Sequence, residues 1–101
     1  MVVRLSQDPH RTQEHEREKV LEVAIGREVR SFRRQQEITV AELSALTGIS
    51  IGMLSKIENG NTSPSLTTLK SLANALSVPL TSFFRRFEES RQAVHTRAGE
   101  G

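Results

Sequence analysis

Apolar residues recur at every third or fourth position through the middle of the chain, which is the spacing of one face of an α-helix. The first stripe predicts a helix that ends near Gln36. Its members are Leu21, Ile25, Val29 and Phe32. The sequence already favours a helix from about Gln13, so this first helix can begin ahead of its apolar residues.

Capping residues predict the bounds of a second and a third helix. Thr39 and Glu42 have the spacing of a capping box, and Gly48 is placed to end the second helix in a left-handed conformation. Ser50 is placed to cap the third helix, and Gly60 to end it. We expect the buried side chains of these two helices to be Leu43, Leu46, Met53, Leu54 and Ile57.

Two more helices follow, and they complete a compact all-α, five-helix bundle. Ser65 is placed to cap the fourth helix, which Pro79 ends, and the segment "LTSFFRRFEES" predicts a short fifth helix in which Arg85 and Arg86 are solvated. The apolar stripe of the fourth helix contains Leu66, Leu69, Leu72, Ala73 and Leu76. No segment has the pattern of a strand, and short connections make neighbouring helices pack together.

The distribution of charge divides the chain into three parts. Residues 1–18 are polar and charged and predict a flexible arm, residues 19–88 form the folded domain, and residues 89–101 have no core-forming pattern and predict an irregular tail. A length of 101 residues suits one small domain. The net charge of +2 permits a nucleic-acid partner without requiring one.

The residue types exclude several kinds of chemistry. The chain has no cysteine, which excludes disulfides and thiolate-bound metal and is compatible with a reducing cytosol. His10, His15 and His95 do not have metal-ligand spacing, so we expect no metal and no cofactor. No cluster of carboxylate, His and Ser suggests an enzyme. No stretch reaches the roughly 20 apolar residues of a membrane span, and the N-terminal residues lack the apolar core of a secretory signal.

The second and third helices carry the pattern that points to function. Both are short, and the tight turn between them contains Gly48 and an inward-facing Ile49. This arrangement is the signature of a helix-turn-helix, which exposes the N-terminal half of its second helix. Such a helix fits the major groove of B-DNA, which is about 12 Å wide.

The segment "LSALTGISIGMLSKIENGNTSPSLTTLKSLANALSVPLTSFF" resembles the helix-turn-helix family of the phage Cro and cI repressors, the XRE family. The resemblance runs from about Leu21 to Glu88 and implies a lambda-repressor-like DNA-binding fold. Within the family the chain is most similar to the N-terminal domain of regulators that carry a C-terminal cupin sensor. The tail "VHTRAGEG" resembles the start of a cupin, so we expect the sequence to be a fragment of a longer regulator.

The resemblance assigns roles to individual residues. It makes the third helix, about residues 50–59, the recognition helix. The base-contacting positions are then Ser50, Ile51, Gly52 and Lys56. The positions near the DNA backbone are Met53, Asn59, Asn61 and Thr62. The resemblance also implies a structural ion pair between Arg33 and Glu58, which would brace the first helix against the third.

The sequence departs from the family pattern at two positions. Val40 replaces a glutamine that often contacts phosphate, so that contact is either absent or made by backbone amides at the start of the second helix. Glu37 replaces a glycine that often follows the first helix, so we expect a differently shaped connection there.

Several of these residues also have ordinary explanations. Gly52 is either a tolerated first-turn glycine or a point of close approach to DNA, and Ile51 is either a scattered surface residue or a contact to a thymine methyl group. Lys56 can be a solvated lysine, but the motif favours a DNA contact. We interpret Arg30 and Arg34 as solvated residues rather than a phosphate-binding patch.

The favoured function is sequence-specific binding of double-stranded DNA by a cytoplasmic transcriptional regulator. We expect a homodimer on a palindromic operator, with half-sites about 34 Å apart. A small-molecule effector is expected only if a C-terminal sensor domain exists. The alternative is a protein–protein interaction module of the same fold, such as an antitoxin or a bridging coactivator.

Overall fold

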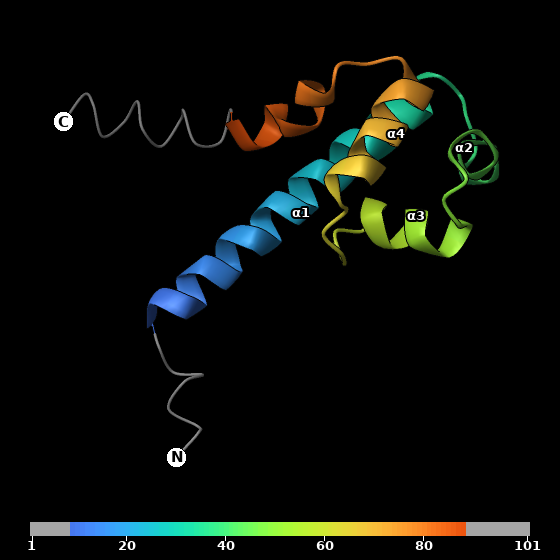
Figure 1. Cartoon of the computed structure of the whole chain (residues 1–101). Helices are drawn as coiled ribbons and strands as arrows, with labels where there is room; N and C mark the ends of the chain where they lie inside the picture. Colours follow the sequence, from blue (N-terminus) through green and yellow to red (C-terminus); the bar gives the residue numbers. More distant parts are fainter. Residues whose placement is uncertain (1–8, 89–101) are drawn as a thin grey trace.

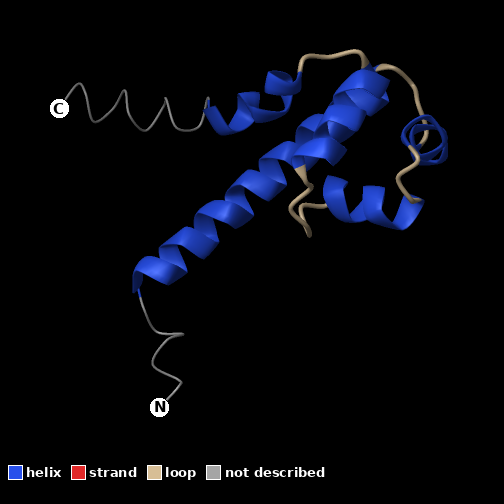
Figure 2. Ribbon diagram, viewed as in Figure 1, coloured by secondary structure: helices blue, strands red, loops and turns tan. Residues whose placement is uncertain are grey.

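The computed structural model describes residues 9–88, and every regular element in that range is a helix (Figure 2). The elements are α1 (Pro9–Gln35), α2 (Val40–Thr47), α3 (Ile51–Glu58), α4 (Leu66–Leu76) and the 3-10 helix η2 (Leu80–Phe84), which continues into a short helical turn over 85–88. The expected all-α, five-helix bundle is therefore confirmed. The expected tail, residues 89–101, and the first eight residues of the expected arm lie outside the described range.

Helix α1 is longer than the sequence pattern predicted. It has 27 residues and begins at Pro9, so residues 9–18, which the sequence assigned to an arm, lie in this helix. Proline is favoured in the first turn of a helix because its missing N–H has no intrahelical partner there. At 1.5 Å per residue the helix is about 40 Å long. Its N-terminal turns extend beyond α3 and α4 (Figure 1), and the side chains of residues 15–20 are exposed.

The core is aliphatic and receives side chains from every element. Phe83 of η2 is fully buried and meets the ring of Phe32 edge-on, with the ring centroids 6.2 Å apart. Leu21 and Phe32 of α1 pack at the margin of the core. The buried cluster consists of Ile25, Val29, Leu43, Leu54, Ile57, Leu69, Leu72, Ala73, Leu76 and Phe83.

Three apolar residues that were predicted to be buried are exposed. The exposed fractions are 61% for Leu46, 40% for Met53 and 63% for Leu66. Helices α2 and α3 have eight residues each, so each can turn only a narrow line of side chains toward the core. Leu66 is the first residue of α4 and lies at the edge of the stripe that packs inward.

The connection between α1 and α2 has the backbone geometry that a glycine adopts easily. Glu37 has φ +57°, in the left-handed region where residues with a side chain are strained. The Gln36 side chain donates from Nε2 to the carbonyl of Leu76 at 2.7 Å and ties this connection to the end of α4. A glutamate thus holds this connection at the cost of a strained backbone.

The end of the described chain is tied to α1. Arg86 forms an ion pair with the buried carboxylate of Glu28, with 3.1 Å between Nε and Oε2. The guanidinium of Arg85 lies 6.0 Å from the centroid of the Phe32 ring. Both arginines are exposed, as predicted, and α1 also supplies each with a partner.

Among residues 9–88, no single helix is long and apolar enough to cross a membrane. Taken together, α2 and α3 pass that test of length and composition, but they are bent by 113° at their junction.

Candidate nucleic-acid interface

The junction of α2 and α3 is a tight turn that side-chain hydrogen bonds hold in place. Gly48 ends α2 with φ +80° and donates its N–H to the carbonyl of Ser44 at 2.8 Å. The Ser44 hydroxyl donates to the carbonyl of Ile49 at 2.6 Å, and the Ile49 N–H donates to the Thr47 hydroxyl oxygen at 3.1 Å. The Ser50 hydroxyl then caps α3 by accepting from the N–H of Met53 at 3.1 Å. The angle of 113° between the two helices is that of a helix-turn-helix.

The outward face of α3 carries all four predicted base-contacting residues. Ser50, Ile51, Gly52 and Lys56 are exposed, and the exposed fraction of Ile51 is 52%. Met53 lies beside them and is also exposed. Ser55 shares this face, although we did not predict it as a site residue; its position between Gly52 and Lys56 was the available signal.

Gly52 has open space on the side where a side chain would start. A Cβ built on its backbone has no protein atom within 4 Å, apart from its own neighbours. Internal packing therefore does not explain this glycine. Both ordinary tolerance and close approach of a ligand to the backbone remain compatible with the geometry.

The opposite face of α3 is locked to α1 by an ion pair that the resemblance implied. Arg33 donates from Nε to Glu58 Oε2 at 2.7 Å and from Nη2 to Oε1 at 2.9 Å. Its Nη1 donates to the carbonyl of Ile38 at 2.9 Å, so the same side chain also holds the entry to α2. The side chain of Glu58 is 3% exposed and that of Arg33 is 12% exposed. The hydrogen bonds to Glu58 raise the pKa of the Arg33 guanidinium.

Arg30 joins this cluster, which corrects its interpretation as a solvated residue. Its Nε lies 3.3 Å from Glu58 Oε1, and its Nη2 donates to Asn59 Oδ1 at 2.6 Å. Arg34, by contrast, is exposed, as expected. The helical spacing of Arg30 and Arg33 was a signal that both could reach the same neighbour.

Two buried glycines allow α1 to lie very close to the end of α3. A Cβ at Gly26 would lie 2.3 Å from the carbonyl oxygen of Ile57 and 2.8 Å from that of Glu58. Gly60 has φ +73°, and a Cβ there would lie 2.8 Å from Cγ2 of Val23. We did not predict either close approach. The available signal for Gly26 was its place inside an apolar helical stripe, where glycine costs about 1 kcal/mol relative to alanine.

The segment after α3 presents the residues predicted to lie near the DNA backbone. Asn59 and Asn61 are exposed, and Thr62 is half-buried. The Asn61 N–H donates to the carbonyl of Lys56 at 2.8 Å, which curls the segment back against α3. Lys19 of α1 donates to the carbonyl of Gly60 at 2.5 Å and to Asn61 Oδ1 at 3.3 Å.

The start of α2 has backbone amides that its own cap does not use. Thr39 and Glu42 form the predicted capping box, in which Thr39 Oγ1 accepts from the Glu42 N–H and Glu42 Oε1 accepts from the Thr39 N–H. The first residues of a helix have no intrahelical acceptor for their N–H groups. Neither α2 nor its cap therefore supplies an acceptor for the N–H groups of Val40 and Ala41.

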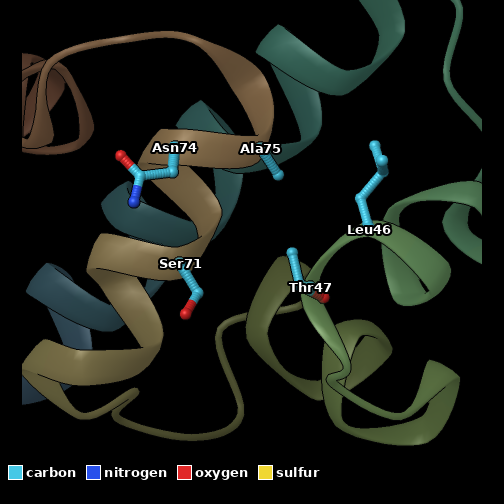
Figure 3. Close-up of a pocket in the computed structure, with 5 residues that line it drawn as sticks. All are labelled: Leu46, Thr47, Ser71, Asn74 and Ala75. Carbon is cyan, nitrogen blue, oxygen red and sulfur yellow. The ribbon is translucent and has the colours of Figure 1, made fainter.

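A separate hollow lies between α2 and α4, and its lining residues belong to these two helices. Its lining comes from the end of α2 and the middle and end of α4 (Figure 3). The lining residues are Leu46, Thr47, Ser71, Asn74 and Ala75. No group of three or more metal-binding side chains occurs in the described part of the chain. His95 and the side chain of His10 lie outside that part.

The helix-turn-helix family model, HTH_3, matches residues 29–83, which is more than half of the chain. Among curated proteins, the uncharacterized HTH-type transcriptional regulator RghRB of Bacillus subtilis (strain 168) is 44% identical over 55 residues, which cover 54% of this chain and 40% of RghRB. The HTH-type transcriptional repressor RghR of the same organism is 37% identical over 57 residues, which cover 55% of this chain and 42% of RghR. The chain therefore spans about 40% of the length of these curated relatives.

Solved structures agree with this similarity. The clp gene regulator ClgR from C. glutamicum superposes with a TM-score of 0.65 at 31% sequence identity, covering 69% of this chain and 91% of that chain. An HTH_3 family transcriptional regulator from Vibrio cholerae superposes with a TM-score of 0.65 at 28% identity, covering 68% of this chain and 39% of that chain.

Proposed function

Because the chain belongs to the helix-turn-helix family of DNA-binding transcriptional regulators, we propose that it binds a specific sequence of double-stranded DNA with the N-terminal half of α3 in the major groove. The observation that carries this proposal is the contrast between the two faces of α3. One face is locked to α1 through Glu58, while the other is exposed and carries Ser50, Ile51, Gly52 and Lys56. A rigidly held helix with a free outer face can enter a groove without rearranging.

Each residue of the outer face offers a contact that suits a base edge. Lys56 can donate to guanine O6 or N7, and Ile51 can pack on a thymine methyl group. The Ser50 hydroxyl oxygen already accepts from Met53, so its hydrogen is the part left to donate. Gly52 lets the backbone approach the groove because no side chain intervenes.

Contacts to phosphates would fix the register of the domain on the duplex. Asn59, Asn61 and Thr62 follow α3, and Met53 lies at the edge of its exposed face. The amides at the start of α2, beginning with Val40, supply the contact that a glutamine makes in other members of the family. A helix N-terminus attracts a phosphate through these free N–H groups.

One domain of this size makes few base contacts, so useful specificity calls for two copies. We propose that a homodimer binds a palindromic operator with half-sites about 34 Å apart. Action in a bacterial cytoplasm belongs to the same proposal, and a response to a small-molecule effector belongs to it only if a C-terminal sensor domain exists.

Selection from a random pool of duplex DNA tests this function directly. The chain is incubated with the pool at two salt concentrations, and the bound sequences are determined. A short palindrome is the expected result, and a single half-site would leave DNA binding in place but remove dimerisation from this part of the chain. Absence of any enriched sequence at both salt concentrations would contradict the proposal.

A protein-binding role is the second candidate, favoured by the exposure of two apolar residues on α3. Ile51 is 52% exposed and Met53 is 40% exposed, and such residues also suit an apolar groove of a partner protein. Salt separates the two functions. DNA binding weakens steeply as salt rises because bound counterions are released from the duplex, whereas an apolar protein contact does not.

A further inference from the structure

One stripe of α1 contacts the whole segment that runs from the end of α3 into the following loop. The stripe has helical spacing, so its members face the same side. They are Lys19, Glu22, Gly26, Arg30 and Arg33. Beyond the contacts of Gly26, Arg30 and Arg33 described above, the carboxylate of Glu22 accepts a hydrogen bond from the Ser63 hydroxyl. Side chains of α1 thus hold the segment of residues 57–63 against one side of the helix.

Two cations of this stripe, the exposed Lys19 and the half-buried Arg30, donate hydrogen bonds to asparagine side chains. Arg30 Nη2 donates to Asn59 Oδ1 at 2.6 Å, and Lys19 Nζ donates to Asn61 Oδ1 at 3.3 Å. Arginine and lysine can only donate, so the amide atom that faces each of them must be the oxygen. The NH2 group of each asparagine is therefore turned away from α1.

These NH2 groups have no acceptor among the residues that the structure describes. Asn59 and Asn61 are both exposed, so the two outward donors meet solvent. An outward amide donor suits an oxygen acceptor such as a phosphate. An unrestrained asparagine would present its oxygen or its NH2 with nearly equal ease, and a phosphate would repel the oxygen.

We propose that Arg30 and Lys19 are positioning residues that orient the side-chain amides of Asn59 and Asn61 so that their NH2 groups donate to DNA phosphates. This inference rests on the proposed DNA-binding function. It assigns α1 a part in binding that the motif in α2 and α3 does not reveal. The guanidinium of Arg30 is itself held in place, because its Nε also bonds to Glu58, the carboxylate that Arg33 binds.

A double-mutant cycle tests whether Arg30 acts through Asn59. The affinity of the chain for its selected duplex is measured for Arg30→Ala, Asn59→Ala and the double variant, with melting curves to confirm that each is folded. Asn59→Ala is expected to weaken binding about fivefold, the worth of one hydrogen bond, and Arg30→Ala about twofold, because a freed amide still presents its NH2 group about half the time. The double variant is expected to bind like Asn59→Ala alone, and Arg30→Lys is expected to restore part of the loss. Arg34→Ala removes the same charge from an exposed site on α1 and is the matched control.

The salt dependence of binding separates positioning from a direct contact. An arginine that touches a phosphate contributes about 0.9 to the slope of log affinity against log salt, while a neutral asparagine does not. We therefore expect the Arg30→Ala slope to match that of Arg34→Ala. A smaller slope, or losses that add in the double variant, would show that Arg30 contacts phosphate itself and would overturn the proposal.

The pair of Lys19 and Asn61 gives an independent test that leaves the ion pairs of Glu58 intact, because Lys19 is exposed and does not contact Glu58. The same cycle is expected for Lys19→Ala and Asn61→Ala, with Arg17→Ala as the control. If Lys56→Ala weakens binding while both asparagine variants bind normally, DNA binding stands and the positioning inference falls. If the unaltered chain binds no DNA, both proposals fall.

Discussion

Gly26 and Gly52 are both helical glycines, but they lie in opposite surroundings. A Cβ at Gly26 would be 2.3 Å from the Ile57 carbonyl oxygen, whereas a Cβ at Gly52 would meet no protein atom within 4 Å. Gly26 is needed because the backbones of α1 and α3 meet there. At Gly52, no contact within the protein requires a glycine. Gly26 of α1 lies against the packed face of α3, and Gly52 lies on the open face of α3.

From this difference we expect stability and binding to depend on separate residues of the same short helix. The packed face contains Leu54, Ile57 and Glu58, all buried. Apart from Ser50, which caps α3, the open face contains residues that no internal contact requires. Substitutions on the packed face should therefore unfold the domain, while substitutions on the open face should leave it folded and change only what it binds.

The largest effect is expected from Glu58→Ala. This change leaves Arg33, whose side chain is only 12% exposed, without its carboxylate. Removal of one partner of a buried pair costs about 3–5 kcal/mol, so the free energy of unfolding should fall by about 4 kcal/mol. Chemical denaturation measures this fall, and Glu18→Ala on the exposed part of α1 is the control. An unchanged denaturation midpoint would show that the ion pair between Arg33 and Glu58 does not stabilise the domain.

The next effect is expected from Gly26→Ala. The added methyl group must displace backbone atoms of α3, and overpacking of this kind costs about 3 kcal/mol. Gly52→Ala adds the same methyl group on the open face and should leave the melting temperature unchanged or slightly higher. Equal destabilisation by Gly26→Ala and Gly52→Ala would contradict the distinction between a packed and an open face of α3.

Lys56→Ala should weaken specific DNA binding by about 2 kcal/mol without lowering stability, because it would remove the proposed base contact of an exposed side chain. Affinities for the selected duplex and for a scrambled duplex measure this. Equal losses on both sequences would make Lys56 a phosphate contact instead of a base contact.

Gly52→Ala should reduce affinity for the selected duplex by about 1 kcal/mol if the α3 backbone lies close to the groove, since one methyl group then clashes or displaces the helix. Titration of the folded variant with the selected duplex decides the matter. Binding as tight as that of the unaltered chain would show Gly52 to be a merely tolerated glycine.

The smallest effect lies away from both faces of α3. Glu37 has φ +57°, which strains a residue with a side chain. Glu37→Gly relieves this strain but adds backbone freedom to the unfolded chain, so we expect a net gain of about 0.5 kcal/mol in unfolding free energy. A thermal melt measures it, and Glu42→Gly, which removes a capping-box side chain and puts a glycine in the first turn of α2, should show a loss.

The sequence by itself determined the elements of this protein. Thr39, Ser50 and Ser65 cap helices where their spacing to the apolar stripes predicted, and Gly48 ends α2 with the expected left-handed backbone. These features depend on neighbours within one helical turn, so they can be recognised along the chain. The resemblance to the family placed Ser50, Ile51, Gly52 and Lys56 on the outer side of the third helix, and the structure shows all four exposed.

Only the tertiary structure decided which distant groups meet. The close approach at Gly26, the contacts of Lys19 and Arg30 with residues 59–61, and the pairing of Arg86 with Glu28 all join segments far apart in the sequence. The exposure of Leu46 and Leu66 was missed for the same reason. The periodicity of the sequence shows which face of a helix a residue occupies. Whether that residue is buried depends on whether another helix covers the face, and the angle between the two helices determines the coverage.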